Sequence, residues 1–233
     1  MAGGQDRRGE VRLPAAVATV VAIALYALLP DDLILGPRLV VPVVEAALLV
    51  VLLVVNPWRM TRETRWSRRV ALTLISLIAL GNLTALAMTV TALVHGAPAA
   101  SRPGTLLLAA LQIWATGVLV FALAFYELDR GGPVSRRSRA RNDLPAADFR
   151  FSHDENRDAV VEVSRSSSQS SDWVPSFADY LYVSLTNSSA FSPTDTMPLT
   201  TRAKALMGIE ATSALLTSLL IIAAGIGQLG SGG

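Results

Sequence analysis

The chain has 233 residues, of which 52% are hydrophobic and 16% are charged, and its mean hydropathy is +0.45. Soluble domains carry about 25% charged residues, so this composition excludes an ordinary soluble fold. The absence of cysteine excludes disulfides, thiol nucleophiles and cysteine-ligated metals. The basic residues flank hydrophobic runs, which favours orientation in a membrane over binding to nucleic acid.

Hydrophobic runs dominate the first half of the chain and recur near its end. A transmembrane helix needs about 20 mostly apolar residues. The first run resembles a signal peptide, but no small-residue cleavage site clearly follows it, so we expect it to be retained. The five predicted spans are Leu13–Leu29, Leu39–Val55, Val70–Val94, Thr105–Tyr126 and Ala205–Gln228.

Residues 127–174 differ in kind, because charges are dense and the stretch SRSSSQSS has low complexity. This composition predicts a solvated, partly disordered loop between membrane segments. A linker is the simpler interpretation, and a small docking element around Asp148–Val163 is the alternative. The predicted organisation is a four-span bundle over 1–126, this loop over 127–174, and a pore-like module over 175–233.

Arginine counts predict the orientation. Sixteen arginines lie in the N-terminal segment, in the connection after the second run and in the long loop, against Arg38 and Arg102 on the opposite side. Basic residues are retained on the cytoplasmic face. We therefore expect a multi-pass protein of the bacterial plasma membrane with its N-terminus and long loop in the cytoplasm.

The polar stretch TNSSAFSPTDTMPLTT, residues 186–201, lies between two apolar segments. The preceding helix, Phe177–Phe191, reaches about 22 Å, which is short of a hydrocarbon core of about 30 Å. Pro193 and Pro198 disfavour a continued helix. We therefore predict a re-entrant half-helix whose polar return faces a water-filled cavity, since irregular backbone needs protein or water around it.

The order of short helix, polar turn, acidic residue and long helix in YLYVSLTNSSAFSPTDTMPLTTRAKALMGIE resembles the pore module of tetrameric potassium-channel-like proteins. Asp195 matches the aspartate that follows the selectivity filter, and the resemblance implies a homo-oligomer, in particular a tetramer. The sequence is also similar to uncharacterised bacterial membrane proteins, mostly actinobacterial, that share AFSPTD-x-MPLT. Ser192-Pro193-Thr194 replaces the Gly-Tyr-Gly filter, and because proline fixes φ, potassium selectivity is not expected.

Ionisable residues inside the predicted spans are the other candidates. Glu45 lies within the second span, where a charge is costly, and is either an ion or proton site or a protonated residue that joins helices. We expect Pro42 to loosen the helix beside it, and Asn82 and Gln112 are its candidate partners. Glu210 shares a helix face with Ser213 and Thr217, and this strip lines a pore or forms interhelical hydrogen bonds.

These patterns predict an all-α membrane protein with five transmembrane helices, one re-entrant half-helix and a pore-like loop. The predicted function is a cation-permeating pore that binds inorganic cations and the lipid bilayer, without nucleic acid, cofactor, metal or enzymatic activity, since no catalytic motif occurs. The alternatives are a non-transporting adaptor that acts through the cytoplasmic loop and a small proton-coupled transporter that uses Glu45. The predicted pathway residues are Thr186, Asn187, Ser192, Thr194, Asp195, Glu210, Ser213 and Thr217.

Overall fold

The computed structural model describes residues 10–34, 36–55, 59–60, 64–95, 103–155, 160–168, 171, 173–190 and 195–230. These residues are mostly helical, as predicted, with two short antiparallel strand pairs. The helices are α1 (Leu13–Ala27), α2 (Val40–Val55), α3 (Arg65–His95), α4 (Pro103–Leu128), α5 (Pro133–Ser138), α6 (Val161–Ser164), α7 (Phe177–Ala190) and α8 (Thr201–Gly230). The strands are β1 (Glu10–Val11), β2 (Arg59–Met60), β3 (Phe149–Arg150) and β4 (Met197–Pro198).

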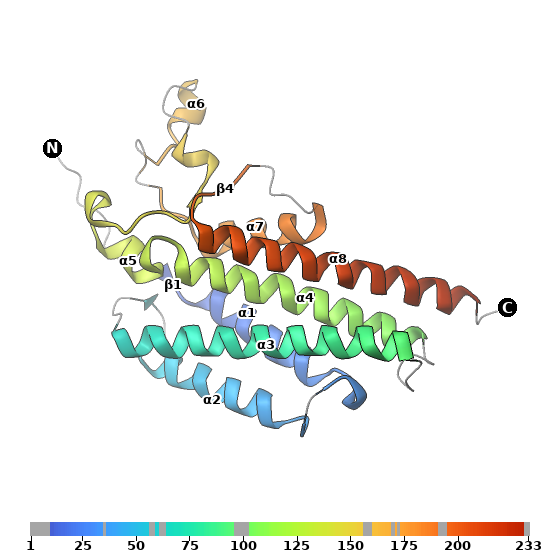
Figure 1. Ribbon diagram of the computed structural model, residues 1–233. Helices are drawn as coiled ribbons and strands as arrows, with labels where there is room; N and C mark the ends of the chain where they lie inside the picture. Colours follow the sequence, from blue (N-terminus) through green and yellow to red (C-terminus); the bar gives the residue numbers. More distant parts are fainter. Residues whose placement is uncertain are drawn as a thin grey trace.

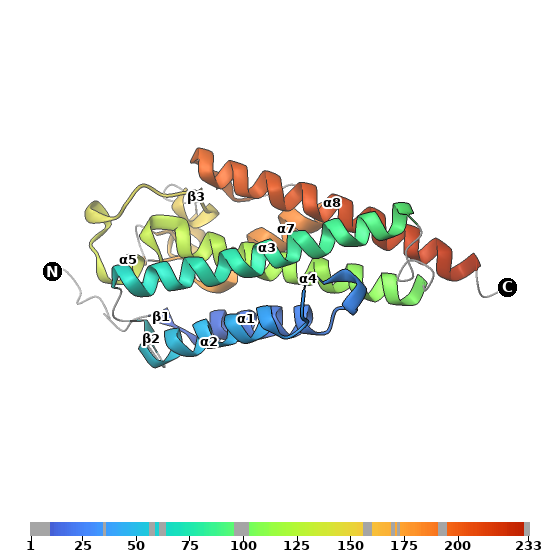
Figure 2. The same ribbon diagram turned by 60° about the horizontal axis from the view of Figure 1, so that its bottom comes forward.

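Five helices, α1, α2, α3, α4 and α8, run lengthwise through an elongated bundle (Figures 1 and 2). The helix α4 is central, since it contacts α1, α3, α7 and α8. Strands β1 and β2 pair where α1 begins and α2 ends. We call this the basic end, where α3, α7 and α8 also begin; the opposite end, with the α1–α2 connection and the start of α4, is the far end.

Three of the helices are long and apolar enough to cross a membrane, over Arg65–His95, Gly104–Gly131 and Thr201–Gly227. They correspond to three of the five predicted spans. The helices α1 and α2 are apolar but have only 15 and 16 residues, fewer than the about 20 that a span requires. Length and composition therefore make three of the five predicted spans candidates for crossing a membrane.

The sides of the bundle are apolar on their outer surface. Side chains as far apart as Val54 on α2, Leu80 on α3 and Ile226 on α8 are 76%, 64% and 66% exposed. The interior of the bundle includes small residues, and Ala22, Ala109 and Ala122 are fully buried. Continuous apolar exposure of this extent is unusual for a soluble monomer and is compatible with contact to lipid.

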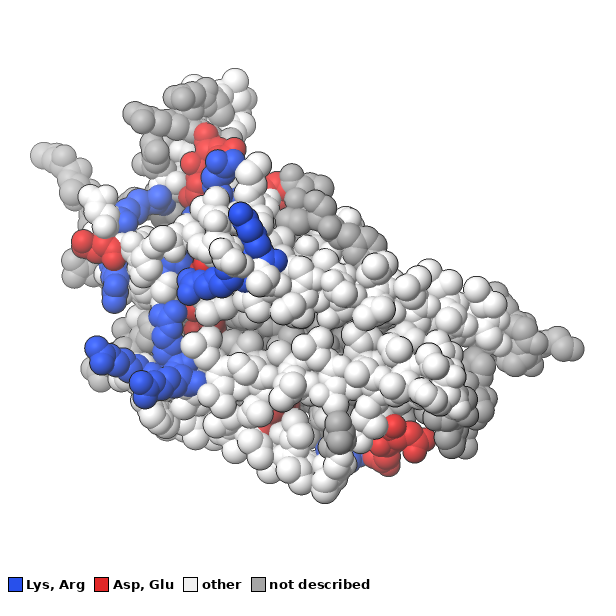
Figure 3. Space-filling model, in the orientation of Figure 1, with Lys and Arg blue, Asp and Glu red and all other residues white. Residues whose placement is uncertain are grey.

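Lys and Arg residues gather at the basic end (Figure 3). In the described part of the chain, Arg38 is the one basic residue in the far-end connections; it lies 3.6 Å from Asp31. The asymmetry that the sequence predicted is therefore present in three dimensions among the described residues.

The segment that follows α4 departs from the prediction of a solvated, partly disordered loop. Phe149 and Phe151 are 1% and 4% exposed, and the Phe149 ring lies 5.0 Å from Phe125 on α4. The Phe151 ring packs edge-on against Tyr180 on α7 at 5.4 Å. Phe149 and Phe151 thus belong to the core of the basic end, although residues 137–143 between them and α4 are exposed. An average over the composition of the segment does not reveal these two buried aromatic side chains. The short helix α6 extends away from the bundle (Figure 1).

Asp148 fastens this segment to the start of α8. Its carboxylate accepts hydrogen bonds from Thr200 and from Arg202, whose Nη2 lies 2.5 Å from Oδ2. Its carbonyl accepts the N–H of Leu199 at 2.8 Å. The pairing of β3 with β4 continues this attachment. Residues 148–150, the first part of the region that was considered as a docking element, therefore brace the start of α8.

The helices α7 and α8 begin at the same end and run in the same direction. Tyr180, near the start of α7, and Arg202, near the start of α8, both reach groups at the end of α4. Further along, Asn187 of α7 meets Met207 and Glu210 of α8. The chain after α7 returns to the basic end, where β4 pairs with β3. At 14 residues, α7 is about 21 Å long and extends part of the way along α8.

Candidate functional site

The carboxyl of Glu210 is held between α7 and α8 by three polar side chains of α7. Asn187 donates from Nδ2 to Oε2 at 2.7 Å, Ser188 donates to Oε1 at 3.1 Å, and Ser184 makes a third bond to Oε1. The three lie on one face of α7 because they are spaced by three and four residues. Glu210 is 1% exposed, so the α7 residues take the place of water around its carboxyl.

The hydroxyl of Ser184 has two acceptors and one hydrogen. It lies 2.8 Å from the carbonyl oxygen of Val118 on α4 and also contacts Glu210. Both contacts are satisfied when Glu210 carries a proton, because the acid then donates to Ser184 and Ser184 donates to Val118. Ser184 thereby links the carboxyl to the backbone of α4 in a chain of hydrogen bonds.

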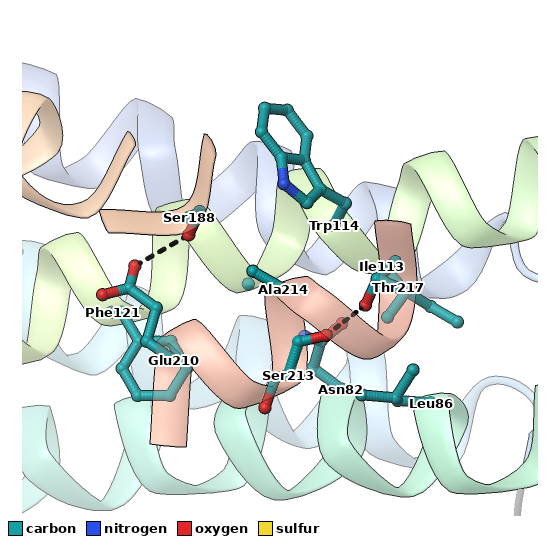
Figure 4. Close-up of a pocket in the computed structure, with 11 residues that line it drawn as sticks. Asn82, Leu86, Ile113, Trp114, Phe121, Ser188, Glu210, Ser213, Ala214 and Thr217 are labelled. Carbon is teal, nitrogen blue, oxygen red and sulfur yellow. Dashed lines mark hydrogen bonds between the residues drawn. The ribbon is translucent and has the colours of Figure 1, made fainter. Parts of the chain in front are cut away.

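A small cavity adjoins Glu210 at the junction of α3, α4, α7 and α8 (Figure 4). It offers about 10 Å³ to the centre of a water-sized sphere, which is about the space that one buried water needs. Its polar lining comprises Asn82, Ser188, Glu210, Ser213 and Thr217. Polar side chains from three helices therefore surround a space suited to one water molecule.

The two hydroxyls of the predicted strip on α8, Ser213 and Thr217, donate hydrogen bonds to backbone carbonyls of their own helix. Ser213 donates to the carbonyl of Ile209 at 2.8 Å, and Thr217 donates to the carbonyl of Ser213 at 2.7 Å. Both side chains still line the cavity, one and two turns beyond Glu210. Their hydroxyl oxygens keep lone pairs for a molecule in the cavity.

The structure separates the residues predicted for the polar loop. Asn187 joins Glu210, whereas Thr186 donates to the carbonyls of Tyr182 and Val183 on its own helix. Asp195 is exposed, two residues before β4. Ser192 and Thr194 lie outside the described residues. A single chain therefore brings together Asn187, Glu210, Ser213 and Thr217, and Thr186 and Asp195 do not line this cavity.

Glu45 stands apart from this cluster. It is 1% exposed, and its Oε2 atom has no hydrogen-bond partner. It lines neither the Glu210 cavity nor a second cavity of about 50 Å³ between α1, α2, α3 and α4. Asn82, predicted as its partner, lies instead in the Glu210 cavity, with its amide beside Gly117.

The expected effect of Pro42 on the helix is also corrected. Pro42 is the third residue of α2, within the first turn. Helical N–H groups have no partner within the helix in that turn, so the missing N–H of proline costs nothing there. Pro42 therefore does not loosen the helix around Glu45.

A buried polar cluster at the entrance of α7 was not anticipated. Tyr180 donates to Oδ2 of Asp129 at 2.6 Å, and Oδ1 of Asp129 accepts the N–H of Asp148 at 2.7 Å. The guanidinium of Arg136 lies over the rings of both Tyr126 and Tyr180, 4.8 and 4.9 Å from their centroids. The available signal in the sequence was Asp129, which comes shortly after the fourth apolar run. Its partners Asp148 and Tyr180 lie far along the chain, so the cluster could not be recognised from a local pattern.

Glu10 completes this cluster. Its Oε2 lies 3.9 Å from Nη2 of Arg136, which is fully buried. Burial raises the pKa of Glu10 above its usual value, while Arg136 and Arg137 act in the opposite direction. The N-terminal strand therefore carries a carboxyl whose charge is costly in this position.

The described residues contain no group of three or more His, Asp or Glu side chains able to hold a metal ion. Comparison of the chain with protein-family models, with curated proteins and with solved structures gave no match.

Proposed function

We propose that this chain is an integral membrane protein that conducts small cations along the interface of α7 and α8. In this proposal the carboxyl of Glu210 lies inside the pathway. The observation that carries the proposal is the buried Glu210 carboxyl, held by three α7 side chains and adjoining a polar cavity. Ionisable residues buried among apolar helices mark ion and proton pathways in membrane proteins.

The proposed topology has five spans, α1, α2, α3, α4 and α8, and the half-helix α7 re-enters from the basic end. The shorter α1 and α2 lie alongside α3 (Figure 1). Apolar side chains are also exposed on both helices, such as Val20 on α1 and Val54 on α2. The basic end is assigned to the cytoplasm of a bacterial cell, because Lys and Arg gather there (Figure 3).

The dimensions favour protons over larger cations. The cavity beside Glu210 has room for about one water molecule. A proton needs only a chain of hydrogen bonds. Glu210 and Ser184 begin such a chain, and a water molecule in the cavity lined by Ser213 and Thr217 would extend it. The pathway begins at the basic end, where Tyr180 bonds Asp129 one turn before Ser184.

The proposed assembly is a homo-oligomer, with a tetramer implied by the resemblance to channel pore modules. Tyr182 and Leu185 on the outer face of α7 are 48% and 42% exposed. A second chain that covers this face would shield the end of α7 from lipid, where unpaired backbone groups are costly. Asp195 would then concentrate cations at the mouth, as acidic rings do.

The test is ion flux into liposomes that contain the purified chain, with H⁺, Na⁺, K⁺ and Cl⁻ measured by dye quenching. The variants are Glu210→Gln and Asp195→Ala, and Glu155→Gln is the matched control, since Glu155 forms a surface ion pair with Arg150. The proposal predicts flux that Glu210→Gln abolishes, that Asp195→Ala reduces and that Glu155→Gln preserves.

Two outcomes contradict the proposal. If the flux is the same in Glu210→Gln and in wild type, the ions do not pass through the α7–α8 interface. Absence of flux for every ion, with the protein folded, would favour the adaptor, whose partner would bind the folded basic end around β3 and α5.

A further inference from the structure

Glu45 is an isolated acidic residue in the interior of the bundle. It lies on α2, which packs against α1 and α3, and it is 1% exposed. Its Oε2 accepts no hydrogen bond, whereas both oxygens of Glu210 are bonded by α7 side chains. The two buried carboxyls therefore have different surroundings and occupy different helix interfaces.

No cation faces Glu45 from the helices packed around it. On α1 the one titratable side chain is Tyr26, which interacts with Glu45. On α3 the charged or titratable side chains, Arg65, Arg68, Arg69 and His95, all lie at its two ends. The α2 helix carries no other charged residue. A carboxylate in this position would be desolvated without compensation, so the neutral acid is the stable form.

Glu45 is the sixth residue of α2, about 8 Å along the helix from the far end. Glu210 is the tenth residue of α8, counted from the basic end. The two carboxyls nevertheless lie at a similar level of the bundle and at different helix interfaces: Tyr26, which interacts with Glu45, packs beside Gly81 on α3, and the next residue, Asn82, lines the Glu210 cavity. A proton reaching Glu45 from the nearer end arrives through the α1–α2 connection, which contains the exposed Asp31.

We infer that Glu45 is a second proton-binding site, separate from Glu210 and approached from the far end of the bundle. The site binds one proton on its carboxyl, and the bound form is neutral. This inference does not rest on ion flux through α7 and α8, because it concerns a different helix interface.

Infrared spectroscopy of the full chain in liposomes tests the inference, because a protonated carboxyl has its own carbonyl stretch. We expect this band at neutral pH in the wild type and in Glu210→Gln, and loss of the Glu45 component in Glu45→Gln. Glu155→Gln is the control for an exposed carboxyl. A protonated-carboxyl band that is the same in Glu45→Gln and in wild type overturns the inference.

A second measurement needs no variant. Lipid-soluble carbodiimides add to protonated carboxyls in apolar surroundings, and the acylisourea that forms rearranges to a stable acylurea. Mass spectrometry of peptides from the labelled wild-type chain should locate an adduct at Glu45, and alkaline pretreatment should reduce its yield. Absence of an adduct at Glu45, while exposed control peptides are recovered, counts against the site.

Discussion

The hydroxyl of Tyr180 on α7 donates to Oδ2 of Asp129, just beyond α4, at 2.6 Å. This bond fixes the start of the half-helix to the end of the central helix. In Tyr180→Phe the buried Asp129 loses a charge-assisted bond, and we expect a loss of about 1.5–3 kcal/mol in the free energy of unfolding. Unfolding in mixed micelles measures the change. Tyr182→Phe, at an exposed position on the same helix, should leave stability unaltered.

Phe149→Ala tests whether the segment after α4 belongs to the core. The Phe149 side chain is buried against Phe125 and Tyr180, so its removal should cost about 3–5 kcal/mol. Val161→Ala is the control, because Val161 is 62% exposed in the same connection. Equal melting temperatures for the two variants would indicate that Phe149 is not in the core and that the segment is a solvated loop.

Asn187→Asp places a second carboxyl beside Glu210. The present Nδ2–Oε2 distance is 2.7 Å, and two carboxyls at such a separation cannot both ionise. We expect a destabilisation of about 3–5 kcal/mol at neutral pH that is relieved on acidification. Asn187→Ala loses hydrogen bonds without adding a charge, so its defect should be smaller and should depend less on pH. Thermal melting at two pH values distinguishes these expectations.

Gly81→Ala probes the contact between α3 and α1. A Cβ at position 81 would lie 3.2 Å from the ring of Tyr26, so the ring must shift, at about 1–3 kcal/mol. Gly208→Ala on α8 meets nothing within 4 Å and should be neutral or stabilise by up to about 1 kcal/mol. A comparison of the two unfolding free energies checks the packing; a larger loss for Gly208→Ala would contradict it.

Glu10 makes stability depend on pH. Burial raises its folded pKa above the unfolded value, so the folded chain binds more protons there than the unfolded chain. The favourable contribution is complete below the unfolded pKa and is lost as pH rises through the folded pKa. Glu10→Gln removes this dependence. The melting temperature of the variant relative to wild type should therefore rise from pH 4 to pH 7, and a constant difference would count against the assignment.

The positions of the long apolar helices were predictable from hydropathy, whereas α5, α6 and the contacts between helices were not. The run Phe177–Phe191 became α7, Phe177–Ala190, because its length and its flanking prolines are local properties of the sequence. The stretch around Phe149 was misjudged because two aromatic residues among many charges do not alter a composition average. Their burial depends on partners from other helices, which no local pattern contains.

In the candidate site, too, the arrangement along one helix was predictable and the contacts between helices were not. Helical spacing placed Glu210, Ser213 and Thr217 on one face of α8, and the structure places all three at one cavity. The sequence did not single out Ser184 and Ser188 as partners of Glu210, because serines within apolar helices are common and carry no signal alone. Their role depends on the parallel alignment of α7 with α8, which follows from the return of the chain to the basic end.

The half-helix has a consequence for how this architecture can change. Because α7 leaves the basic end and β4 lies at that same end, the excursion adds no net crossing of the bundle. Its gain or loss would leave the direction of α8 unaltered, whereas adding one full-length helix would reverse it. A module of this kind can be acquired, exchanged or discarded without inverting anything that follows it in the chain.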